Sequence, residues 1–107
     1  MSDKLRALQK IANLMLEQQL AALKLANQQR DDTRRKLADL DQPGNWEDGS
    51  IQAAARAAML YQTWVDVRRR DLNLHLARES VAVLKAQDQA RLAFGKDMAL
   101  QRLLQRK

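Results

Sequence analysis

His75 is the only histidine of the chain, and so the only imidazole that could act in catalysis or bind a metal ion. A histidine acts as a general base or metal ligand when carboxylates or cysteines stand at suitable spacing. The sequence has no cysteine, glycine-rich phosphate loop or nucleophile elbow. We therefore expect no enzyme activity, no cofactor and no metal ion, and we interpret His75 as a surface or interface residue.

Tyr61, Trp64 and Arg68 share a helical face with His75, because steps of three, four and seven residues keep side chains on one side of a helix. Aromatic residues make up only 4% of the chain, so this pair stands out. Tyr, Trp and Arg dominate the hot spots of protein interfaces. The four residues are thus a candidate partner-binding site; the alternative is that the aromatics cap a thin coiled coil near its turn.

Proline and glycine show where the helices that carry these residues must be separated. The only proline and two of the three glycines fall within residues 42–50. Proline removes a backbone donor, whereas glycine and asparagine favour turns. The 107 residues therefore predict a single domain, with a helix over about residues 3–41, a turn over about 42–50 and a second helix over about 51–105.

Apolar residues recur along one stripe of each predicted helix, in alternating steps of three and four, which is typical of a coiled-coil seam. The first stripe comprises Leu5, Ala12, Leu16, Leu23, Ala26, Leu37 and Leu40, with polar interruptions at Gln9, Gln19, Arg30 and Thr33. The second comprises Ile51, Ala55, Ala58, Val65, Leu72, Leu76, Val83, Ala86, Ala90, Ala93, Leu100 and Leu104, with interruptions at Gln62, Arg69, Glu79 and Asp97. A short turn requires antiparallel pairing. The predicted fold is all-α: a long antiparallel two-helix coiled-coil hairpin with the C-terminal helix overhanging.

The predicted overhang is at the C-terminal end of the second helix. If the turn centres near residues 45 and 46, Leu5 lies beside Ala86 and the last ~20 residues have no partner within the hairpin. Exposed apolar side chains of that kind mark an interface. The sequence therefore predicts partner-binding residues at Leu92, Phe94, Met98, Leu100, Leu103 and Leu104. Self-association, or a bend at Gly95 that folds the end back, would cover the same surface.

The chain is basic, with a net charge of +6 and a pI near 10.2. Acidic residues are interleaved with the basic clusters at 34–36 and 68–70, and no nucleic-acid recognition motif is present. We interpret the clusters as solvated helix faces and keep nucleic-acid binding as a minor alternative. No apolar run reaches the roughly 20 residues of a membrane span, and the start lacks the apolar core of a signal peptide. We expect a cytoplasmic protein whose contact with the inner membrane is at most peripheral.

The second helix ends in the run QARLAFGKDMAL over residues 89–100, within a chain rich in Ala, Leu, Gln and Arg. In its whole layout, this small basic hairpin resembles the FliJ/YscO group of type III export proteins. The resemblance implies a non-enzymatic, stalk-like component of a bacterial flagellar or type III export apparatus that binds the export ATPase, the gate or chaperones. The alternatives are a self-assembling structural coiled-coil protein and a basic nucleic-acid-associated protein.

Overall fold

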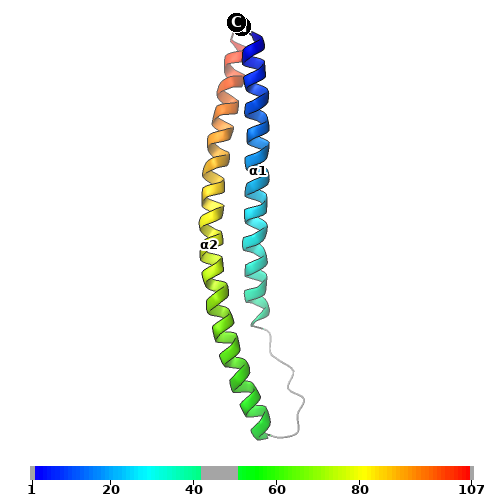
Figure 1. Ribbon diagram of the computed structural model, residues 1–107, viewed down its shortest axis with the longest axis vertical. Coiled ribbons are helices and arrows are strands. Elements are labelled where there is room, and N and C mark those ends of the chain that lie inside the picture. Colours follow the sequence, from blue (N-terminus) through cyan, green and yellow to red (C-terminus); the bar gives the residue numbers. More distant parts are fainter. Residues whose placement is uncertain (1, 42–50, 107) are drawn as a thin grey trace.

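The computed structural model describes residues 2–41 and 51–106, and these form two long helices. Helix α1 spans Ser2–Asp39 and helix α2 spans Ile51–Gln105. They run antiparallel, so that both chain termini lie at the same end of a rod measuring 83 × 20 × 14 Å (Figure 1). The predicted all-α hairpin is confirmed. The predicted turn over residues 42–50 lies outside the described residues.

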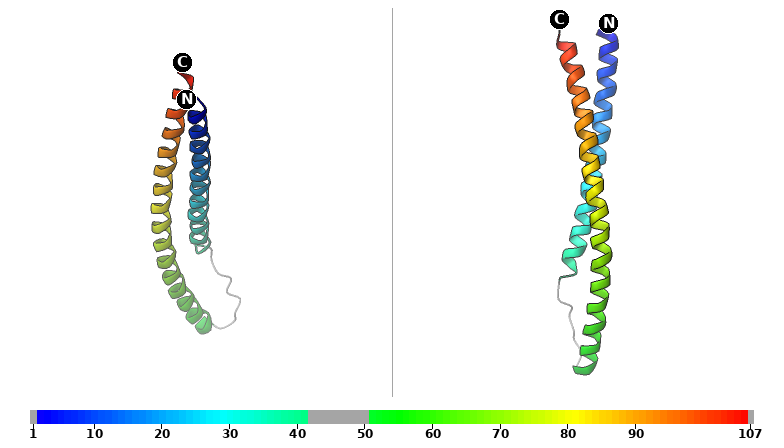
Figure 2. Two further views of the ribbon diagram at one scale, coloured as in Figure 1. Left: turned by 45° about the horizontal axis from the view of Figure 1, so that its top comes forward. Right: turned by 90° about the vertical axis from the view of Figure 1, so that its left-hand side faces the viewer.

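The seam between the helices follows the stripes predicted from the sequence. The left view of Figure 2 shows α1 and α2 side by side, with α2 curved along its length, and the right view shows the two helices crossing. The buried apolar residues all belong to the predicted stripes: Ala12, Val65, Leu72, Val83, Ala90 and Ala93. Because most of them are alanine or valine, the core is thin and little apolar area is removed from water in each layer.

The polar interruptions of the two stripes pair with one another across the seam. Asp97 is 3% exposed, and its Oδ1 accepts a hydrogen bond from Gln9 Nε2 at 3.1 Å. The buried Thr33 hydroxyl donates to Glu79 Oε1. These contacts satisfy groups that would otherwise cost about 1–3 kcal/mol each if buried without a partner. The pairing therefore fixes the alignment of the two helices.

An ion pair at the far end of α1 agrees with this alignment. Arg69 Nη2 lies 2.8 Å from Asp41 Oδ1, just beyond the last turn of α1. Both side chains are largely exposed, so the pair contributes little to stability. It nevertheless shows that α1 ends opposite the region of Arg69.

The predicted position of the overhang is wrong. Leu5 does not lie beside Ala86, because the bond from Gln9 to Asp97 places the start of α1 next to the last turns of α2. The last residues of α2 therefore have a partner: Ala90, Ala93 and Asp97 are buried in the seam. The prediction assumed that the helices pair directly on either side of a tight turn. In that alignment Glu79 would face Ala12 and Thr33 would face Ala58, so neither polar group would have a polar partner.

The C-terminal helix does overhang, but at its beginning. Helix α2 has 55 residues and α1 has 38, a difference of roughly 26 Å at 1.5 Å per residue. Since Asp41 pairs with Arg69, the part of α2 before Arg69 extends past the last described residue of α1 (Figure 1). The alternative of a bend at Gly95 is also wrong, because α2 continues as a regular helix through this residue.

We expect Gln9→Leu to lower the free energy of unfolding by about 1–3 kcal/mol, because Asp97 would stay buried after losing a donor. Urea denaturation followed by circular dichroism measures this loss. Replacing both partners, as Gln9→Leu with Asp97→Leu, should recover most of it, since no buried carboxylate is then left.

The matched control is Gln18→Leu, which changes an exposed glutamine of the same helix. It should leave the free energy of unfolding within about 0.5 kcal/mol of the wild type. A Gln9→Leu variant as stable as this control would contradict the buried contact with Asp97.

Gly95→Ala should raise the free energy of unfolding by about 0.5–1 kcal/mol, because glycine is unfavourable inside a helix. An added Cβ at Gly95 meets no atom within 4 Å, so no clash offsets the gain. The reverse change at an exposed position, Ala82→Gly, should lower stability by a similar amount. Thermal denaturation of the two variants checks both signs; a destabilised Gly95→Ala would contradict a continuous helix at this point.

Candidate protein-binding groove

A shallow apolar groove runs between the two helices near the end of the rod that carries the termini. Its α1 wall is formed by Leu8, Ile11 and Met15, and its α2 wall by Lys96, Ala99 and Leu100, with Ala12 between them. The groove continues toward the middle of the rod past Gln19, Gln89 and Leu92. It exists because the seam beneath it is made of Ala12 and Ala93, which are too small to fill the space between the helices.

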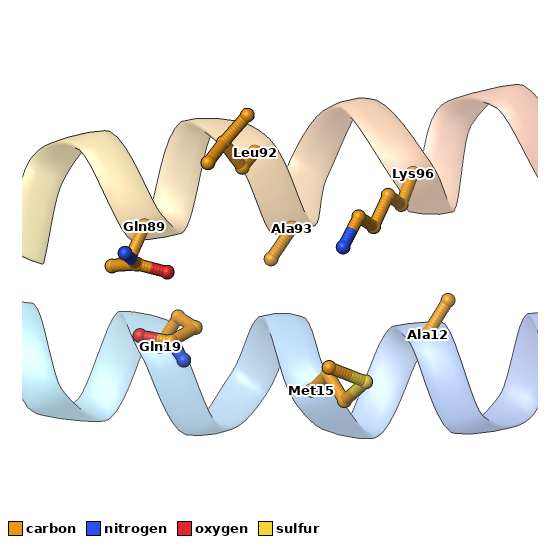
Figure 3. A pocket seen from close by; sticks show the side chains of 7 residues that line it. All are labelled: Ala12, Met15, Gln19, Gln89, Leu92, Ala93 and Lys96. Carbon is orange, nitrogen blue, oxygen red and sulfur yellow. The ribbon is translucent and has the colours of Figure 1, made fainter.

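Figure 3 shows the side chains that line the part of the groove nearer the middle of the rod. Ala12, Met15 and Gln19 come from α1, and Gln89, Leu92, Ala93 and Lys96 come from α2. Gln19 and Gln89 face one another across the space between the helices, while Lys96 reaches toward α1. The amides of Gln19 and Gln89 thus lie at the end of the groove nearer the middle of the rod. Toward the termini the groove is apolar except for Lys96.

The surroundings of the groove carry positive charge. Lys96 lines it directly, and further exposed basic residues lie at the same end of the rod: Lys4, Arg6, Lys10, Arg102 and Arg106. Of the acidic residues near this end, Asp3 is exposed, and Asp97 is buried in the seam and hydrogen-bonded to Gln9 and Gln101. The groove therefore suits an apolar segment with acidic flanks.

The partner-binding residues predicted near the end of α2 lie in three different places around the helix. Leu92 and Leu100 line the groove. Leu103 is exposed and follows Leu92, Lys96 and Ala99 on the same flank by steps of four and three. Phe94 and Met98 lie on the opposite flank of the seam, and Leu104 is half-buried on the seam itself.

The aromatic group predicted in α2 lies apart from the groove. The rings of Tyr61 and Trp64 are stacked, with centroids 6.0 Å apart and an angle of 28° between their planes. Trp64, Arg68 and His75 are exposed, whereas Tyr61 is half-buried. These residues lie on or next to the overhanging part of α2, so they form a second candidate surface, and its role in binding stays a prediction.

The residues of the α1 wall of the groove were not predicted from the sequence. Leu8, Ile11 and Met15 repeat in steps of three and four, one position before the seam residues Gln9, Ala12 and Leu16. A search for a second apolar stripe would have found them. The sequence pattern does not show that these α1 residues lie beside Leu92 and Ala99, because that proximity depends on how the two helices are aligned.

The basic cluster over residues 34–36 is partly neutralised within its own helix. Arg34 lies 3.8 Å from Asp31, and Arg35 forms an ion pair with Asp32. Arg91 makes a similar contact with Asp88 at 3.9 Å. Such pairs of exposed residues three positions apart agree with solvated helix faces and leave less charge available for phosphate.

Neither α1 nor α2, over the residues described, is long and apolar enough to cross a membrane. Across residues 2–41 and 51–106, no group of three or more His, Asp or Glu side chains is arranged to hold a metal ion.

Comparison with known proteins finds no family model, no curated protein and no solved structure that matches this chain. The structural support for a functional proposal therefore comes from the hairpin itself, its groove and its exposed apolar faces.

Proposed function

We propose that this chain is a non-enzymatic, stalk-like coiled-coil component of a bacterial flagellar or type III export apparatus. The observation that supports this proposal best is the apolar groove with Lys96 at the terminal end of an 83 Å rod. A groove between two helices accepts the apolar face of a third helix. The type of apparatus rests on the resemblance of the whole chain to the FliJ/YscO group.

The rod shape supports a mechanical, associative role. A two-helix hairpin has a thin core and no enclosed interior, so its surface is what it offers to other molecules. In this chain many large apolar side chains are exposed, among them Leu8, Ile11 and Leu92 around the groove. Exposed apolar patches of this extent mark interaction sites.

The charges around the groove indicate the chemistry of the partner. Lys96 and the basic residues near the termini would attract an acidic surface, and the groove floor would take apolar side chains. We therefore expect the partner segment to be an amphipathic helix with acidic flanks, supplied by the export ATPase, the export gate or a chaperone.

Leu92→Asp should weaken binding to the export ATPase, gate protein or chaperone of the same organism by about tenfold or more, since it places a charge in the apolar groove. Isothermal titration with each purified candidate measures the affinity. The matched control is Phe94→Asp: Phe94 is 54% exposed and Leu92 is 61% exposed, but they lie on opposite flanks of the seam.

Equal losses for Leu92→Asp and Phe94→Asp would contradict docking in the groove. Wild-type chain that binds none of the three candidates would overturn the export function. Raising the salt concentration should slow association more than it speeds dissociation, because long-range attraction to the basic end is screened. Stopped-flow measurements at two ionic strengths separate these rates.

A further inference from the structure

A second apolar stripe runs along α2 on the side away from α1. It consists of Leu60, Val67, Leu74 and Val81, spaced seven residues apart and between 51% and 73% exposed. Val67 is two residues from the buried Val65, a rotation of about 200° around the helix, so the stripe faces opposite the seam. We call these four residues the outer stripe.

Large apolar side chains every seven residues supply one of the two apolar positions of a coiled-coil heptad. At the second position, three residues later, Ala77 and Leu84 are apolar, whereas Thr63 and Arg70 are polar. Helix α1 already occupies the seam side of α2, and no other described part of the chain reaches the outer stripe (Figure 1). Within residues 2–41 and 51–106 the stripe is uncovered, and its apolar surface is open to a helix from another molecule.

We propose that the outer stripe binds a second copy of this chain, with the two α2 helices antiparallel and a two-fold axis close to His75. A two-fold interface makes each contact twice. This alignment sets Leu74 against Ala77 of the second copy and Val67 against Leu84 of the second copy. Leu84 is itself exposed, so each apolar layer of the pair would bury surface that the single hairpin leaves in water.

The charges beside the outer stripe favour this occupant and this direction. The antiparallel alignment brings Asp71 beside Arg78 of the second copy, and the reverse pair forms by symmetry. Both residues are exposed, and neither forms an ion pair within the described part of the chain. Trp64, which is also exposed, comes beside Lys85 of the second copy, where a cation–π contact can form.

A parallel pair of the same helices fits less well. In register, it would place Arg70 against Arg70 of the second copy and Asp66 beside Asp71 of the second copy. Like charges at such positions destabilise a coiled coil, whereas opposite charges set the direction of pairing. The antiparallel pair avoids both contacts. It keeps Val67 and Leu74 in apolar layers, whereas Val81 lies against Arg70 of the second copy.

The test measures the self-association of the full chain by sedimentation equilibrium. The wild type is expected to dimerise in the micromolar range, and Leu74→Asp should weaken dimerisation by about tenfold or more. The matched control is Leu14→Asp, because Leu14 is an exposed leucine of α1 remote from the outer stripe. Circular dichroism verifies that both variants remain helical. A wild type that is monomeric up to millimolar concentration, or equal effects of the two variants, would overturn the proposal.

A charge exchange tests the direction. Asp71→Arg alone sets two arginines together across the interface, and Arg78→Asp alone sets two aspartates together, so each should weaken the dimer. The double variant with both changes restores opposite charges and should recover wild-type dimerisation. Failure of the double variant to recover would overturn the antiparallel pair. Ile11 lines the groove from α1 and is outside α2 altogether, so Ile11→Asp should leave dimerisation unchanged while it disturbs the groove, which separates this proposal from the export function.

Discussion

Two hydrogen bonds between polar seam residues, Gln9 to Asp97 and Thr33 to Glu79, decide how the helices of this hairpin are aligned. The apolar part of the seam discriminates weakly, because alanines such as Ala12, Ala90 and Ala93 fit against many neighbours. Sliding one helix by a turn would leave buried polar groups without partners, at a cost of about 1–3 kcal/mol each. Stability and alignment thus come from different residues of the same seam.

The alignment determines which surfaces the molecule offers. Because the start of α1 lies against the end of α2, the small seam residues there open a groove beside Lys96, and the overhang falls at the opposite end of the rod. A thin seam also leaves large apolar side chains outside it, on the flanks and on the outer stripe. We propose that the groove holds one partner while the outer stripe pairs with a second copy.

The sequence was sufficient for the helices and for the residues of the seam, since a period of three and four residues is a local property. It also identified the polar interruptions, including Asp97 and Glu79, but not which residues they face. That pairing depends on the path between the helices, which the single proline and the glycines do not fix, and so the overhang was placed at the wrong end. Leu92 and Phe94 were predicted to act together, yet the position of Ala93 in the seam puts them on opposite flanks. The groove joins side chains of both helices, and no pattern within one helix could predict it.

Spin-label distances test the alignment most directly, because the chain has no cysteine and labels attach only where cysteines are introduced. One variant carries labels at Arg6 and Arg102, and another carries them at Arg6 and Gln87; all three positions are exposed. Dilution with unlabelled chain restricts the signal to distances within one molecule. The structure predicts that the first pair is close and that the second is separated by roughly 22 Å more along the rod. A shorter distance between positions 6 and 87 than between 6 and 102 would contradict the alignment set by Gln9 and Asp97.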